Sequence, residues 1–152
     1  MARSWSLVWA LLPAAALAPA APALKDRPPK EPPIFGEWVR VGHTEAGAPV
    51  SPDREPHHQV FQADGQWEYF YGGRQGAAGR KSFVTDPRQS PPAIDIHMDP
   101  AGRPSWRGIY KVEGDTLTLC LVKGDRDRPK AFESTPDRPT TVWVFKRVIP
   151  KD

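Results

Sequence analysis

The stretch from Trp106 to Val122 constrains the fold of this chain more than any other. It reads W-R-G-I-Y-K-V-E-G-D-T-L-T-L-C-L-V, two runs of strand-forming residues that meet at Gly114-Asp115. Glycine at the first central position of a two-residue loop suits a type II′ turn. The sequence therefore predicts a β-hairpin that turns at these two residues.

The same turn predicts the register of the hairpin. Because strand side chains alternate between two faces, a slip of one residue would expose the whole apolar face to solvent. The apolar face includes Trp106, and the predicted pairs on it are Gly108 with Leu121, Tyr110 with Leu119 and Val112 with Leu117. The opposite face is mostly polar, with Ile109 and Cys120 as apolar exceptions.

Other short runs of strand-forming residues fill the chain between residues 34 and 148, and no segment of ten or more residues shows helical periodicity. A second hairpin is predicted at Asp64-Gly65, a pair suited to a type I′ turn. About eight strands joined in sequence form a meander, and closing a meander removes its exposed edges. We expect an all-β fold, an eight-stranded antiparallel up-and-down barrel, with a two-sheet sandwich as the alternative. The other expected strands are 35–41, 60–63, 67–71, 80–85, 93–98 and 140–148.

The first 23 residues have the composition of a secretory signal peptide. A basic residue, Arg3, precedes an apolar run that ends in small residues, so cleavage is expected near Ala20 or Ala23. The run is shorter than the roughly 20 residues of a membrane span, so no stable span is expected. Residues 24–33 read as a leader rich in proline and charge, and residues 34–149 as the barrel domain. The sequence predicts a secreted or periplasmic protein.

The charges of the chain are mixed along its length. Without Arg3, 20 basic residues face 18 acidic ones, which leaves a formal charge of +2. No basic stripe of the kind that follows a phosphate backbone appears, so a nucleic-acid partner is not expected. Cys120 is the one cysteine, so the chain has no internal disulfide, and its place in a strand predicts a buried thiol.

Six motifs follow one another in a fixed order along the chain: Gly36-x-Trp38, Pro92-Ala-Ile-Asp95, Gly108-Ile-Tyr110, Gly114-Asp115-x-Leu-x-Leu-Cys120, Arg128-Pro-x-x-Phe132 and Lys146-Arg147. Together they resemble a planctomycete family of exported domains of unknown function. The resemblance covers almost all of residues 34–148 and implies a lipocalin-like barrel, without catalytic residues. In lipocalins a basic residue of the last strand stacks on the Trp of Gly-x-Trp, which implies a cation–π contact between Arg147 and Trp38.

No group of residues predicts catalysis. Asp95 and His97 share a strand face and could form a general-base pair, but no nucleophile accompanies them. His57 and His58 are adjacent, so a regular strand would point them to opposite faces and away from one metal ion shared with His43. We therefore expect no enzyme, no metal and no cofactor.

Aromatic residues are the main candidates for binding. Gly108 leaves a gap between Trp106 and Tyr110 where a flat apolar group could sit, unless the glycine merely relieves crowding. Phe132 is expected to insert into the barrel mouth and anchor the loop 123–139 as a lid, while Arg128 bonds a carboxylate or carbonyl.

The expected function is non-catalytic binding of a small apolar molecule at the mouth. One alternative is a filled barrel that binds another exported protein through its surface or serves a structural role. A hydrolase-like enzyme is less favoured. Asp115 and Arg128 are predicted to be structural.

Overall fold

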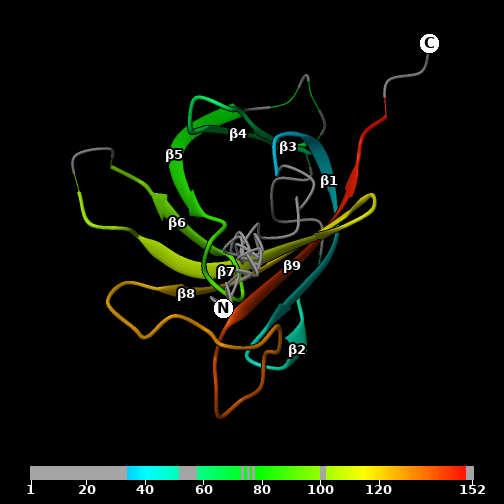
Figure 1. The fold of residues 1–152 in the computed structure, drawn as a ribbon. Helices are drawn as coiled ribbons and strands as arrows, with labels where there is room; N and C mark the ends of the chain where they lie inside the picture. Colours follow the sequence, from blue (N-terminus) through cyan, green and yellow to red (C-terminus); the bar gives the residue numbers. More distant parts are fainter. Residues whose placement is uncertain are drawn as a thin grey trace, which may run out of the picture.

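The computed structural model describes residues 34–51, 58–72, 74, 76, 78–99 and 102–149. From β3 to β9, each strand pairs antiparallel with the next. β1 pairs with β3, and the two-residue β2 folds back on the end of β1. Pairing of β9 with β1 closes the other eight strands into a barrel, visible as a ring in Figure 1. The strands are β1 (Gly36–Glu45), β2 (Ala48–Pro49), β3 (His58–Phe61), β4 (Gln66–Phe70), β5 (Ala78–Asp86), β6 (Ala93–His97), β7 (Trp106–Glu113), β8 (Thr116–Lys123) and β9 (Thr141–Arg147).

The predicted eight-stranded up-and-down barrel is therefore confirmed, and the sandwich alternative is wrong. Residues 1–23 and 24–33, predicted as signal peptide and leader, lie outside the described residues. Across the described segments, no helix has the length and apolarity to cross a membrane.

The β7–β8 hairpin has the predicted register. Val112 lies opposite Leu117, Tyr110 opposite Leu119 and Gly108 opposite Leu121. Gly114 has a φ of +57°, whereas Asp115 is not among the residues with positive φ, as a type II′ turn requires. The predicted apolar face points into the barrel, where it supplies much of the buried core.

The β3–β4 hairpin differs from the prediction by one residue. Gln62 and Gln66 are bonded across it, with the Gln66 carbonyl accepting from the Gln62 N–H at 2.8 Å. Three residues therefore form the loop, with Gly65 at a φ of +84° and bonded to the Gln62 carbonyl. This is a type I turn followed by a left-handed glycine, so the predicted type I′ turn at Asp64-Gly65 is wrong. The extra residue places Phe61 opposite Trp67, and both are buried.

One end of the barrel, called the base, is closed by Trp38 and Arg147. The Arg147 guanidinium lies 4.1 Å from the centroid of the fully buried Trp38 ring, so the predicted cation–π contact is confirmed. Arg147 also donates to the Phe35 carbonyl at 3.0 Å. Gly36 has a φ of +128°, and a Cβ there would lie 2.9 Å from the Arg147 guanidinium, so glycine is required for this closure.

The segment between β8 and β9, residues 124–140, runs over the outer wall of the barrel and is called the strap (orange in Figure 1). Arg128 attaches it to the sheet through an ion pair with Asp95 at 2.8 Å. The same side chain donates to the carbonyls of Ile94 and Gly108 at 2.9 and 2.6 Å. The prediction that Arg128 bonds a carboxylate or carbonyl is thus confirmed.

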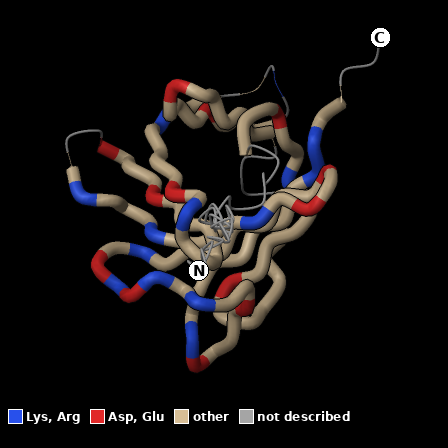
Figure 2. The backbone as a smooth tube through the Cα atoms, in the orientation of Figure 1, with Lys and Arg blue, Asp and Glu red and all other residues tan. Residues whose placement is uncertain are grey.

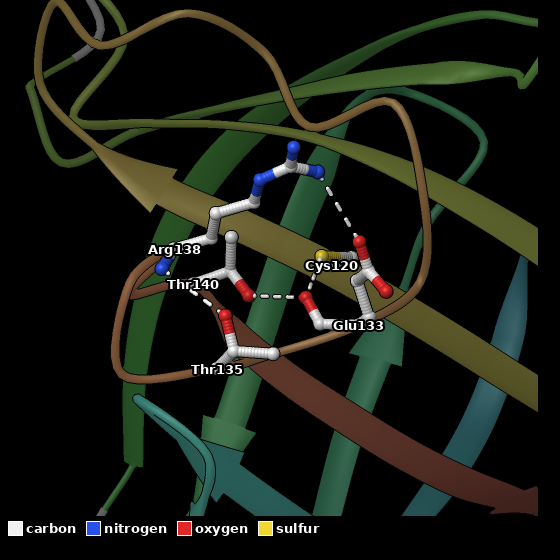
Figure 3. A network of polar contacts seen from close by, with 5 residues as sticks. All are labelled: Cys120, Glu133, Thr135, Arg138 and Thr140. Atoms are coloured by element: carbon white, nitrogen blue, oxygen red, sulfur yellow. Dashed lines mark hydrogen bonds and ion pairs between the residues drawn. The ribbon is translucent and has the colours of Figure 1, made fainter.

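The strap also explains why Ile109 and Cys120 are apolar although they point outward. Both are almost fully buried, at 1% and 0% exposure, and the Cys120 thiol lies 3.8 Å from the Glu133 carbonyl of the strap. Thr140 donates to the same carbonyl at 2.6 Å, as Figure 3 shows. Burial raises the pKa of the Cys120 thiol, so the protonated form is favoured.

The position of Phe132 corrects a prediction. The Lys111 ammonium lies 5.3 Å from the centroid of the Phe132 ring. Tyr110 and Val112 point into the barrel, so Lys111 between them points outward. Phe132, which contacts Lys111, is therefore half-buried against the outer wall. The expectation that it inserts into the barrel mouth is therefore wrong. The strap instead covers the outward-facing apolar residues Ile109 and Cys120.

Candidate functional site

The end of the barrel opposite the base, called the mouth, contains a pocket of about 490 Å³. It lies where β1 and β8 end and where β7 and β9 begin, together with both ends of the strap. Its walls combine apolar, cationic and anionic side chains. The lining residues are Glu45, Trp106, Leu121, Val122, Lys123, Gly124, Arg126, Pro139 and Thr141.

Trp106 and Lys123 form the cross-strand pair at the rim of this pocket. The Lys123 ammonium lies 5.0 Å from the centroid of the Trp106 ring, within the range of a cation–π contact. One further hydrogen bond, from the Gly124 N–H to the Ser105 carbonyl at 3.0 Å, continues the ladder beyond this pair. The rim is therefore ordered by the same hairpin that determines the fold.

The interior below the rim is aromatic. Trp143 lies 6.1 Å from Trp106 and 6.3 Å from Trp67, measured between ring centroids. His43 meets the Trp143 ring edge-on at 6.1 Å. The indole N–H of Trp143, which is 8% exposed, finds no acceptor among the described residues. Trp143 does not itself line the mouth pocket.

The predicted gap beside Gly108 is filled. A Cβ at this position would lie 2.4 Å from a methyl carbon of Leu121 and 2.3 Å from the Cys120 carbonyl oxygen. Tyr110 belongs to the buried core at 5% exposure and does not line the mouth pocket. The glycine relieves crowding, and the expected slot between Trp106 and Tyr110 is wrong because Leu121 occupies it.

Of the three residues predicted to bind a ligand, Trp106 alone lines the mouth pocket, while Tyr110 lies in the core and Phe132 lies on the outer wall.

Residues predicted to be structural do come together at the base. Gly36, Trp38 and Arg147 meet at the base, and the Asp115 carbonyl there accepts from the Arg147 N–H at 2.9 Å.

Asp95 and His97 do not form a catalytic pair. Asp95 is paired with Arg128, and the His97 Nδ1 lies 3.2 Å from the Gly102 carbonyl oxygen. The histidines do not meet either, since His43 is buried beside Trp143 while His58 bonds Glu37 at 3.1 Å. His57 lies outside the described residues. Among the described residues, no three His, Cys, Asp or Glu side chains are grouped so that they could hold a metal.

A second pocket, of about 430 Å³, opens between the two arms of the strap and is called the outer groove. It shares Val122, Arg126 and Pro139 with the mouth pocket, so the two adjoin. Charges of both signs follow the strap in Figure 2. Two of the groove's cations are already paired, since Arg128 binds Asp95 and Arg138 lies 3.3 Å from a Glu133 carboxylate oxygen.

Sequence reasoning missed Glu45, Lys123, Arg126 and Thr141 at the mouth. A signal existed for Lys123, because it continues the inward alternation of Leu117, Leu119 and Leu121 by one more step. Glu45 and Thr141 come together through the β1–β9 pairing, which joins residues far apart in the chain. Local patterns do not reveal such a contact.

Comparison of the chain with known protein families, with curated proteins and with solved structures found no match.

Proposed function

We propose that this chain is an exported, non-catalytic binding protein that takes a small molecule in the mouth pocket. The observation that carries the proposal is the pocket of about 490 Å³ at one end of a barrel whose other end is packed with apolar side chains. Pockets of roughly 300–1,000 Å³ are typical of small-molecule sites. Export is supported by the composition of residues 1–23.

The packed half of the barrel limits what can bind. Trp38, Phe61 and Phe145 are each at most 1% exposed and fill the base, so a ligand is confined to the mouth. Trp106 and Leu121 offer it an apolar wall. The resemblance to a lipocalin-like family implies the barrel and supplies no catalytic residues.

A protein-interaction module has less support. Among the described residues, six large apolar side chains are exposed, the most exposed being Val41, Val84 and Ile149 at 60%, 62% and 65%. Val41 lies on β1, Val84 on β5 and Ile149 beyond the end of β9, so they are spread over the barrel. Single exposed apolar residues are normal on protein surfaces and do not indicate a docking patch.

The test is isothermal titration calorimetry of the purified protein with a panel of fatty acids, alcohols and aromatic metabolites. We expect at least one compound to bind saturably and to bind about tenfold more weakly to Trp106→Leu, which is about 1.4 kcal/mol at 25 °C. Val84→Ala on the outer wall is the control and should leave the affinity unchanged. If nothing in the panel binds, or if a folded Trp106→Leu binds as the wild type does, the mouth is not a binding site.

A further inference from the structure

We infer that the ligand of the mouth pocket is an amphiphilic anion, with an apolar body and one negatively charged group held by Lys123 and Arg126. This inference rests on the proposed function. It replaces the apolar ligand that the sequence alone predicts. The gap at Gly108 on which that prediction depended is filled, whereas the pocket is lined by two cations.

Lys123 is held in place before any ligand arrives. Its ammonium lies over the Trp106 ring at 5.0 Å, so the indole face at the rim carries a positive charge. A cation–π contact at an exposed site restrains a flexible lysine without neutralising its charge. Trp106 therefore offers the ligand an apolar wall and also holds a cation beside it.

Neither Lys123 nor Arg126 forms an ion pair with another part of the described chain. The other arginines around the strap do so: Arg103 with Asp125, Arg128 with Asp95 and Arg138 with Glu133. The charges that hold the strap are thus balanced locally, whereas the two cations of the mouth pocket remain available to a ligand.

Glu45 limits the charge that the pocket accepts. It is the one acidic residue of the described lining, which also contains the cations Lys123 and Arg126, so the lining carries a formal charge of +1. A ligand with one negative charge would balance the pocket, while a second charge would be opposed by Glu45.

The test compares ligands that differ in one charged group. Anilinonaphthalene sulfonate is matched with the neutral N-phenylnaphthylamine, and decanoate with decanol. We expect each anion to bind at least tenfold more tightly than its neutral partner at low salt. We also expect this preference to shrink as salt is raised, because the charges of an exposed rim are screened. Comparing the aromatic pair with the alkyl pair shows whether the pocket prefers a flat aromatic body or an alkyl chain.

The variants locate the charge. Lys123→Gln and Arg126→Gln should each weaken anion binding about tenfold and leave the neutral compounds unchanged, whereas Glu45→Gln should strengthen it. Lys130→Gln is the matched control, because Lys130 lines the outer groove and not the mouth pocket. Circular dichroism confirms that each variant is folded.

The outcomes separate this inference from the proposed function. Equal binding of anions and neutral compounds, lost in Trp106→Leu, would overturn the anion preference and leave the mouth as a binding site. A loss of anion binding in Lys130→Gln as large as in Lys123→Gln would move the site to the outer groove and refute the inference. If no compound binds at all, both proposals fail.

Discussion

Gly108 shows that a glycine on a strand can indicate either a gap for a ligand or a close contact in the core. Glycine on the inner face of a strand predicts either a gap or relief of crowding, and the two differ only in what the opposite strand places there. Leu121 lies opposite Gly108 and extends a methyl group toward it. The glycine is thus a requirement of the β7–β8 pair.

We predict that Gly108→Ala destabilises the fold by about 1–3 kcal/mol, the usual cost of overpacking a core. The added Cβ would meet the Cys120 carbonyl oxygen at 2.3 Å, and a backbone atom cannot move aside as a side chain can. Gly42→Ala on β1 is the control, since its Cβ would lie 3.4 Å from Val144. Urea unfolding measures both. Similar losses for the two variants would show that Gly108 is not specially confined.

At the mouth, the residues that sequence reasoning found are those of one local pattern. Trp106 was predicted because it belongs to the hairpin whose turn and alternation are clear. The sequence places Lys123 at the start of the loop 123–139, whereas β8 continues through it. A lysine after an apolar run reads as the start of a loop, and the residue that Lys123 contacts, Trp106, lies on the neighbouring strand.

The two hairpins show how far an element can be predicted. In β7–β8 the two-residue turn has one suitable conformation for Gly114-Asp115, and the whole register follows from it. In β3–β4 the Asp-Gly pair fits both a two-residue and a three-residue loop, and the structure has the longer one. One added residue then exchanges the faces of β3, which turns Phe61 inward and leaves Val60 partly exposed.

The strap is an element whose attachment can be measured through Cys120. The Glu133 carbonyl and the rest of the strap bury this thiol, and burial raises its pKa, so little thiolate is present near pH 8. Since the thiolate is the reactive form, a maleimide should label the native protein slowly.

We predict that Arg128→Met increases the labelling rate of Cys120 at least tenfold. The change removes the ion pair to Asp95 and two hydrogen bonds to the sheet, so the strap opens more often. Arg103→Met removes an ion pair in which both side chains are highly exposed, and it should leave the rate unchanged. Equal rates for all three proteins would mean that Arg128 does not hold the strap.

At the scale of the whole molecule, the eight strands of the barrel and their order could be predicted from the sequence, but the two-residue β2 could not. Each strand is a short alternating run, and consecutive runs pair with each other. The mouth pocket could not be predicted in the same way, because it depends on the register in which β1 and β9 pair when the barrel closes. Closure brings Glu45 beside Thr141, almost a hundred positions away in the chain.

We predict that removing residues 141–152 converts the protein into aggregates, because loss of β9 leaves β1 and β8 as unpaired edges. Removing residues 149–152 alone keeps β9 and the Arg147 contact, and this shorter protein should elute at the same oligomeric state as the full chain. Size-exclusion chromatography with light scattering measures both. A stable, non-aggregated product of the longer deletion would contradict the role of closure.

The base and the mouth are built on opposite ends of the same strands. β7 begins at Trp106 on the rim and ends at Glu113 near the base, eight residues that extend on the order of 25 Å at about 3.3 Å per residue. Substitutions separated by that distance usually have additive effects on stability. The rim residues can therefore be varied in a combinatorial library while Trp38 and Arg147 continue to close the fold, which makes this barrel a scaffold for engineering new specificities.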